Sequence, residues 1–287
     1  MNIFEKAKWR FDYIIGNKPV LMSGLIPLFL TGRLSTQYPV LAEAGKKKII
    51  AFEKKDDAFF IKFLDFTFKI PVAGFVEGDF FDIIYQPILG KKIKKPFFFE
   101  GPYEMEGVSL NEGDFVIDAG ANVGLFSIFS SKKVTEKGKV FSFEPMENVI
   151  SFLRNNIQSN KRTNIEIFQM ALGEEEKEVF FSSDGGFEGY SKHFGESKNI
   201  PVHQITIDNF VEKNKIEKIN FIKADIEGSE RDMLRGGEKT IKRFKPKLSI
   251  RTYHLPDDPE VLEKIIHEFV PEYKIEHGKK TIYAWVE

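Results

Sequence analysis

The chain has 287 residues and a mass of 33.1 kDa, enough for one large domain with a smaller appendage. Its 42 basic and 43 acidic side chains leave a net charge of −1, which argues against the basic surface that a broad nucleic-acid footprint needs. The lack of cysteine excludes disulfides, thiolate catalysis and cysteine-ligated zinc or iron–sulfur clusters. The apolar run at residues 20–30 is interrupted by Gly24 and Pro27 and is too short to span a bilayer, so we expect a cytoplasmic protein.

The first hundred residues carry no motif that we can assign. Apolar positions at helical spacing predict a helix over residues 3–15, and the glycines and prolines of residues 16–45 indicate irregular structure. Further along, the pattern predicts a strand at 48–53, a hairpin at 59–71, a short helix at 78–90 and a strand at 95–101. We therefore predict that residues 1–100 form a small mixed α+β appendage of unknown function and that residues 101–287 form a second domain.

From residue 114 the pattern changes to a regular alternation of strands and helices. The expected strands are 115–118, 139–145, 164–172, 220–228, 247–254, 273–277 and 281–286, and the expected helices are 122–133, 146–160, 229–242 and 258–269. Near-continuous apolar strands that alternate with helices are typical of a parallel sheet covered on both faces. The predicted fold is therefore α/β and Rossmann-like: a doubly wound, mostly parallel sheet that ends in an antiparallel C-terminal edge hairpin.

The loop "DAGANVG" follows the first of these strands, where an open α/β sheet binds its ligands. Gly120 permits a tight turn and close approach of the backbone, and Gly124 permits close packing of the helix on the strand. The spacing matches neither the dinucleotide fingerprint nor a P-loop, and the acid Asp118 suits a ligand that bears a cation. An ordinary strand–helix turn is the alternative.

Glu144 ends the next strand, twenty residues after Gly124 and just before Pro145. An acid at this position accepts the ribose hydroxyls of a nucleoside ligand. It could also be an ordinary exposed acid, but together with the glycine loop it favours a nucleoside cofactor.

A third polar segment, "IKADIEGSE" at residues 222–230, ends another strand. Asp225 and Glu227 lie two residues apart and would point the same way if the strand continued. Glu230 is read more simply as an acid in the first turn of a helix, favoured by the helix dipole.

These blocks, together with "FSFEP", Ala171–Leu172 and "KPKLSIRTYH", resemble the FkbM-type methyltransferase family over residues 100–287. The resemblance implies an S-adenosylmethionine-dependent, mostly O-directed methyltransferase, in which Tyr103 lies near the cofactor. It departs from many relatives after the last parallel strand, where this chain has Arg251, Tyr253 and His254 in place of an acid.

The resemblance also implies a role for each segment. The backbone of Gly120, Ala121 and Asn122, with Asp118 behind it, would hold the methionine moiety, and Glu144 would take the ribose hydroxyls. The segment around Met170 and Ala171 would flank the adenine. Asp225 and Glu227 would face the sulfonium and the substrate. The acceptor that we expect is a hydroxyl of a sugar, glycan or small metabolite.

A hydroxyl acceptor benefits from a general base, for which we select His254, with Asp225 and Glu227 as competitors. The same three residues could instead hold a divalent cation. Residues 182–199 are expected to be either a substrate-recognition loop or a solvated connection. Three alternatives stay open: an RNA methyltransferase with the same cofactor site, a nicotinamide-dependent oxidoreductase, and a cofactor-binding module without catalysis. We expect neither nucleic acid as a partner nor a bound metal.

Overall fold

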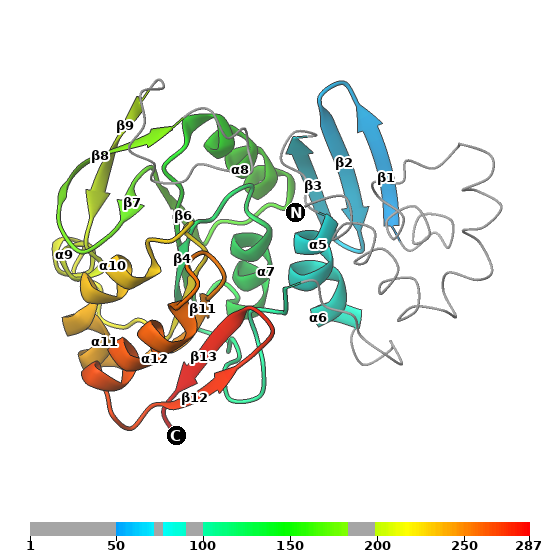
Figure 1. Cartoon of the computed structure of the whole chain (residues 1–287). Coiled ribbons are helices and arrows are strands. Elements are labelled where there is room, and N and C mark those ends of the chain that lie inside the picture. The colour runs from blue at the N-terminus through cyan, green and yellow to red at the C-terminus, as the bar shows by residue number, and fades with distance from the viewer. Residues whose placement is uncertain (1–49, 72–76, 90–99, 183–198) are drawn as a thin grey trace.

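The computed structural model describes residues 50–71, 77–89, 100–182 and 199–287 (Figure 1). The helix expected at 3–15, the irregular segment at 16–45, most of the strand expected at 95–101 and most of the 182–199 connection lie outside these residues. Within the described residues, no helix is long and apolar enough to cross a membrane.

A seven-stranded sheet forms the centre of the molecule, with the order β12-β13-β11-β10-β4-β5-β6. Its strands are β4 (Phe115–Ala119), β5 (Lys139–Phe143), β6 (Ile165–Phe168), β10 (Phe221–Ala224), β11 (Lys247–Arg251), β12 (Lys274–His277) and β13 (Thr281–Trp285). The pairs from β6 to β11 are parallel, and β13 is antiparallel to both of its neighbours. The predicted fold class and C-terminal hairpin are confirmed, with β13 inserted between β11 and the edge strand β12.

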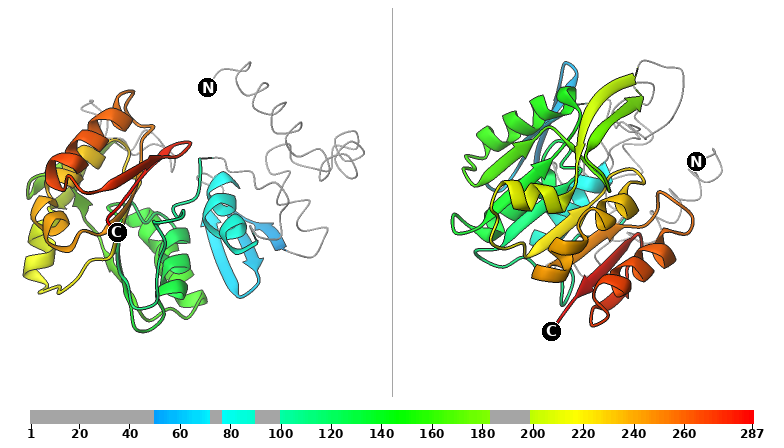
Figure 2. Two further views of the ribbon diagram at one scale, coloured as in Figure 1. Left: turned by 90° about the horizontal axis from the view of Figure 1, so that it is seen from below. Right: turned by 90° about the vertical axis from the view of Figure 1, so that its left-hand side faces the viewer.

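Helices cover both faces of this sheet, because successive strand residues point to opposite sides. On one face Val116 and Val140 pack with α7 (Leu125–Val134) and α8 (Glu147–Ser159). On the other face Ile117 and Phe141 pack with α9 (Ile207–Lys213), α10 (Glu230–Arg235), α11 (Glu238–Phe244) and α12 (Asp258–Phe269). Figure 2 shows this three-layer arrangement from two sides.

The expected strand at 164–172 and helix at 229–242 are each divided in two. β6 ends at Phe168, and β7 (Ala171–Leu172) joins a separate sheet with β9 (Asn199–Ile205) and β8 (Lys177–Ser182). The helix breaks between α10 and α11 at Gly236, where a Cβ atom would lie 2.0 Å from the carbonyl oxygen of Gly173. Both breaks thus depend on contacts between segments far apart in the sequence.

The N-terminal part contains an antiparallel meander of β1 (Ile50–Lys55), β2 (Ala58–Phe63) and β3 (Phe66–Pro71). Three short helical segments follow: α5 (Glu77–Asp79), the π-helical η2 (Phe80–Tyr85) and α6 (Gln86–Leu89). Asn156 and Asn160 of α8 exchange hydrogen bonds of 2.6–2.9 Å with the backbone of β3. Phe63 and Phe80 join the same hydrophobic cluster as the α7 face of the central sheet, so this part packs firmly on the sheet's helical layer (Figure 2).

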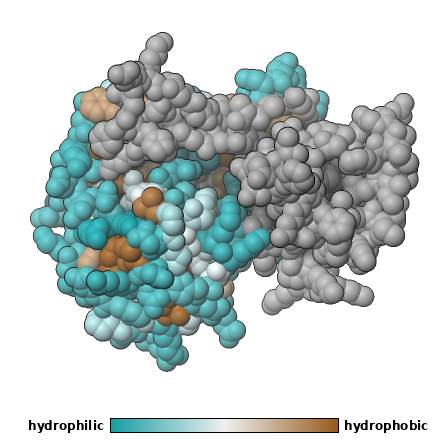
Figure 3. All heavy atoms as spheres, viewed as in Figure 1, coloured by the Kyte–Doolittle hydropathy of each residue, from teal (hydrophilic) through white to brown (hydrophobic). Residues whose placement is uncertain are grey.

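The surface of the described residues is mixed in character. On the face shown in Figure 3 it is mostly hydrophilic, with small separated hydrophobic areas. Tyr253 and Leu255, next to the ends of the central strands, are among the exposed hydrophobic side chains at 38% and 37%.

Candidate active site

A cavity of about 420 Å³ lies at the carboxyl ends of β4, β5 and β10. Ten of the residues predicted from the sequence line it: Tyr103, Gly120, Ala121, Asn122, Glu144, Pro145, Met170, Ala171, Asp225 and Glu227. Asp118, Gly124 and His254 do not line it, although each touches a residue or loop that does. The topology therefore brings three separate sequence motifs to one site.

The glycine loop is held close to the end of the neighbouring strand β10. Gly120 has a φ of +74°, and a Cβ atom there would lie 2.0 Å from the backbone oxygen of Asp225. The backbone amides of Gly120 and Ala121 both donate to the carbonyl of Phe143, at 3.0 and 2.9 Å. Gly124, with a φ of +90°, leaves room for Leu153. Glycine is thus required here by backbone conformation and by packing within the protein.

Asp118 lies beneath this loop and is fully buried. It accepts a hydrogen bond of 2.6 Å from the hydroxyl of Ser127 and forms an ion pair of 3.0 Å with Lys223. Lys223 also donates to the carbonyls of Ala119 and Gly120, at 3.1 and 2.6 Å. The Asp118–Lys223 pair therefore fixes the shape of the loop from below.

Glu144 presents a nearly buried carboxylate to the cavity, with 7% of the residue exposed. Its oxygens accept hydrogen bonds from the backbone amides of Asn122 at 2.9 Å and Met146 at 3.0 Å. Burial raises the pKa of Glu144 to about 7, against the opposing effect of these two hydrogen bonds. Each carboxylate oxygen keeps a free lone pair, so the group could accept the two vicinal hydroxyls of a ribose. Together with the backbone cradle around Gly120, it fits a nucleoside cofactor.

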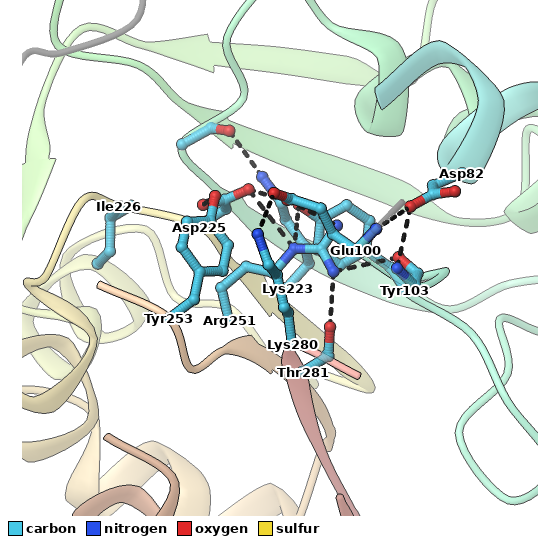
Figure 4. Close-up of polar contacts among 12 residues, drawn as sticks. Asp82, Glu100, Tyr103, Lys223, Asp225, Ile226, Arg251, Tyr253, Lys280 and Thr281 are labelled. Atoms are coloured by element: carbon cyan, nitrogen blue, oxygen red, sulfur yellow. Dashed lines mark hydrogen bonds and ion pairs between the residues drawn. The ribbon is translucent and has the colours of Figure 1, made fainter. Parts of the chain in front are cut away.

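Arg251 is fully buried at the other end of the cavity (Figure 4). Its guanidinium lies over the ring of Tyr103 at 4.1 Å and donates to the Tyr103 hydroxyl at 3.1 Å. It also donates to the carbonyl of Gly101 at 3.1 Å and to the hydroxyl of Thr281 at 2.6 Å. Arg251 thus joins the strand ends of β11 and β13 to the segment that carries Tyr103.

Asp225 lies against this guanidinium, with 3.7 Å between its carboxylate and Nε of Arg251. The hydroxyl of Tyr103 donates to it at 2.7 Å, and that of Tyr253 lies 3.4 Å away. Burial raises the pKa of Asp225, but the charges of Arg251 and Lys223 outweigh burial and hold that pKa below its usual value. Asp225 is therefore a fixed, ionised group and a weak proton acceptor.

His254 is enclosed by three carboxylates. Its Nδ1 lies 3.0 Å from Glu230, and its Nε2 lies 3.5 Å from both Asp225 and Glu227. Burial lowers the pKa of His254, but the three carboxylates outweigh burial and raise it to about 9. The ring is then protonated at neutral pH and has no free nitrogen to accept a proton, which argues against the base role that the sequence suggested.

The same cluster contains possible metal ligands, because oxygen or nitrogen atoms of Asp225, Glu230 and His254 lie within 4.8 Å of one another. A metal ion needs one ring nitrogen and the carboxylates to converge on a single point. Here the two nitrogens face different carboxylates, which is the arrangement of a protonated imidazole that bridges two anions. The geometry favours ion pairs over a metal centre.

We expect His254→Gln to remove a pH-dependent part of the stability. Because the pKa of about 9 in the folded protein lies above the 6.5 of an ordinary histidine, the stabilisation is complete below about pH 6.5 and is lost as the pH rises through about 9. Allowing for solvent screening, the wild type should lose roughly 1–2 kcal/mol over this range that the variant does not lose. Denaturant unfolding at several pH values measures this, with the exposed His203→Gln as the control. Equal pH slopes for the wild type and His254→Gln would contradict the ion-pair cluster.

The structure also adds residues that sequence reasoning missed. Ile70, Asp79, Ile83 and Glu100 line the cavity from the N-terminal part of the chain, and Tyr253 lines it from the end of β11. Burial, together with nearby Glu100 and Asp225, raises the pKa of Asp79 to about 8. The only sequence signal for Asp79 was an acid in a strongly apolar segment, "GDFFDII", and it did not indicate which ligand site the acid would reach.

Comparison with known proteins agrees with this geometry. Residues 118–275, more than half of the chain, match the family described as the Methyltransferase FkbM domain. The chain belongs to this family, as the sequence predicted, and S-adenosylmethionine is the methyl donor that goes with it.

Individual relatives are distant. "Methyltransferase 1" of Beauveria bassiana is 25% identical over 166 residues, which cover 50% of this chain and 66% of that protein. "Hexuronic acid methyltransferase AglP" of Haloferax volcanii is 24% identical over 157 residues, which cover 55% of this chain and 63% of that protein. The crystal structure of methyltransferase FkbM from Methylobacillus flagellatus KT shares the fold, with a TM-score of 0.50 and 24% identity over 62% of this chain and 45% of that one. The chain thus matches less than two thirds of each of these relatives.

Proposed function

We propose that the protein transfers a methyl group from S-adenosylmethionine to a hydroxyl of a sugar, glycan or small metabolite by in-line displacement. The observation that carries this proposal is that Glu144, at the tip of β5, lines the same cavity as Asp225 and Glu227, which follow β10. One end suits the nucleoside of the cofactor and the other suits an acceptor. The name of the Haloferax relative supports a sugar as the acceptor.

On this proposal the loop and strand tips hold the cofactor. Glu144 accepts the ribose hydroxyls, and the backbone of Gly120, Ala121 and Asn122 lies along the methionine moiety. Met170 and Ala171 flank the adenine. When bound, S-adenosylmethionine supplies an electrophilic methyl group. The protein binds and orients the cofactor and the acceptor and takes up the acceptor's proton.

We assign to Glu227 the role of general base, which accepts the proton of the acceptor hydroxyl. Its side chain lines the cavity and is 46% exposed. Partial burial raises its pKa above the usual value, against the opposing charge of His254, which makes it a stronger base than an ordinary carboxylate. Its φ of +54° is unusual for a residue other than glycine, and such strain is common at functional sites. Glu227 would take the proton that the acceptor hydroxyl loses when it receives the methyl group. Protonated His254 then holds Glu227 and Asp225 in place.

The other candidate functions have less support. An RNA methyltransferase would need cations around the cavity, but Lys223 is the only lysine or arginine among the described residues that line it. A nicotinamide-dependent oxidoreductase would need the other glycine spacing.

The test is untargeted mass spectrometry of cell extract incubated with the protein and S-adenosylmethionine. We expect one hydroxyl-bearing component to gain a methyl group, at a rate that Glu227→Gln lowers by about 10²–10⁴-fold without weakening cofactor binding. The exposed Glu112→Gln is the matched control. Methylation of RNA, or tight binding of NAD with no response to the methyl donor, would sink the proposal.

A further inference from the structure

The end of the cavity beside Asp225 is strongly acidic. Four carboxyl side chains line it: Asp79, Glu100, Asp225 and Glu227. In the part of the chain that the structure describes, Lys223 is the only cationic side chain of the lining, and it is engaged by Asp118 and by the carbonyls beneath the glycine loop. The lining itself therefore leaves a surplus of negative charge at this end.

Three of the four carboxyl groups have partners behind the lining. Asp225 lies 3.7 Å from Arg251, Glu100 forms an ion pair of 3.0 Å with Lys280, and Glu227 lies 3.5 Å from His254. Figure 4 shows the groups around Arg251 and Lys280.

Asp79 differs from these three. Within the described residues its carboxyl group has neither a hydrogen bond nor an ion pair. It comes from α5, outside the segment that matches the family, so it belongs to the part of the site supplied by the N-terminal region.

The electrostatic surroundings of Asp79 indicate which ligand group it suits. Burial, and then the charges of Glu100 and Asp225, raise its pKa to about 8, so the carboxyl group keeps a proton that an exposed aspartate would lose. The negative charges of Glu100 and Asp225, which add to the effect of burial, also attract a cationic ligand group, and such a group can replace the proton. A carboxylate on the acceptor would instead face the like charges of Glu100 and Asp225.

We propose that Asp79 binds a protonated amine of the acceptor, so that the acceptor is a hydroxyl compound that also carries an amino group. This inference rests on the methyltransferase function proposed above. A protonated amine has no free electron pair and cannot attack the methyl group. Asp79 therefore binds the amine while the hydroxyl accepts the methyl group. The proposal separates this chain from a relative named for an acidic sugar, because the acid group of such an acceptor would lie among the carboxylates of Glu100, Asp225 and Glu227.

The experiment uses radiolabelled S-adenosylmethionine and a pool of small polar metabolites, half of which is first treated with acetic anhydride in bicarbonate to block amines. Labelled product is separated on a cation exchanger at mildly acidic pH. We expect a product that the exchanger retains and that disappears from the acetylated pool. Asp79→Asn should lower its initial rate by about 10- to 100-fold, the cost of losing a charge-assisted hydrogen bond, while Asp57→Asn, an exposed acid of the same region, should not.

Calorimetry on the same variants tests whether Asp79 takes part in cofactor binding. Asp79→Asn is isosteric, and we expect it to bind S-adenosylmethionine and S-adenosylhomocysteine as the wild type does. Weaker binding of the former alone would mean that Asp79 serves the sulfonium, and would overturn the proposal. A neutral or acidic product, a product that survives acetylation, or an unchanged rate for Asp79→Asn would overturn it too. Absence of any labelled compound other than unreacted S-adenosylmethionine would instead contradict the proposed function itself, and with it this inference.

Discussion

Gly120→Ala is expected to lower the affinity for S-adenosylhomocysteine by about 100-fold, because a loop displaced by about 1 Å no longer fits its ligand. The added methyl group would lie 2.0 Å from the carbonyl oxygen of Asp225, and the loop and the end of β10 would have to separate. The left-handed backbone at this position adds about 1–2 kcal/mol of strain for any residue other than glycine. We therefore also expect the free energy of unfolding to fall by about 3 kcal/mol in total.

Gly113→Ala is the matched control for this variant. Gly113 has a similar positive φ, +85°, but a Cβ atom there would meet only the side chain of Lys137 at 3.9 Å. Calorimetry and denaturant unfolding of both variants separate backbone strain from the clash. If Gly120→Ala binds the ligand as the wild type does, the close approach of the loop to Asp225 is not needed for cofactor binding.

The part of the cavity formed by the central sheet was predictable because its residues lie at fixed places on regular elements. Gly120 follows one buried strand, Glu144 ends the next, and Asp225 follows a third. Parallel strands place all three carboxyl ends at one edge of the sheet, so the apolar pattern was enough to bring them together.

The part of the cavity that the N-terminal region supplies was not predictable in the same way. Asp79 and Glu100 reach the cavity only because the N-terminal part packs on α7 and α8, a tertiary contact with no local pattern. The division of the strand at 164–172 and of the helix at 229–242 has a similar origin in contacts across the fold.

His254 shows a different limit of what can be predicted from the sequence. Its place at the end of β11 could be read from the sequence, but its charge state could not. Glu230, read as a helix-terminal acid, is fully buried and accepts a hydrogen bond from the backbone amide of Ile226 at 2.8 Å. That bond positions Glu230 against His254, and the resulting ion pair raises the pKa of His254, which favours a cation over the neutral base that we expected.

Cofactor affinity is expected to depend on pH through Glu144. The carboxylate accepts hydroxyl hydrogens only when it is ionised, and burial sets its pKa at about 7 in the free protein. Affinity for S-adenosylhomocysteine should therefore be highest above pH 7 and should fall by up to about tenfold for each pH unit below it. Binding below pH 7 should release up to one proton, which calorimetry in buffers of different ionisation enthalpy detects.

Glu144→Gln should flatten this profile and weaken binding at pH 8 by about 10- to 100-fold, because a charge-assisted hydrogen bond becomes a neutral one. Glu147→Gln, which changes an exposed acid at the start of α8, is the matched control.

Two other groups near the cavity titrate away from pH 7: the pKa of Asp225 lies below its usual value, and that of His254 is about 9. Asp79, with a pKa of about 8, and Glu227, whose pKa is also raised, are the groups that could interfere, and neither Asp79→Asn nor Glu227→Gln should change the profile of S-adenosylhomocysteine. A profile that Asp79→Asn flattens and Glu144→Gln does not would move the cofactor's ribose away from Glu144 and place cofactor atoms at the end of the cavity that we assign to the acceptor.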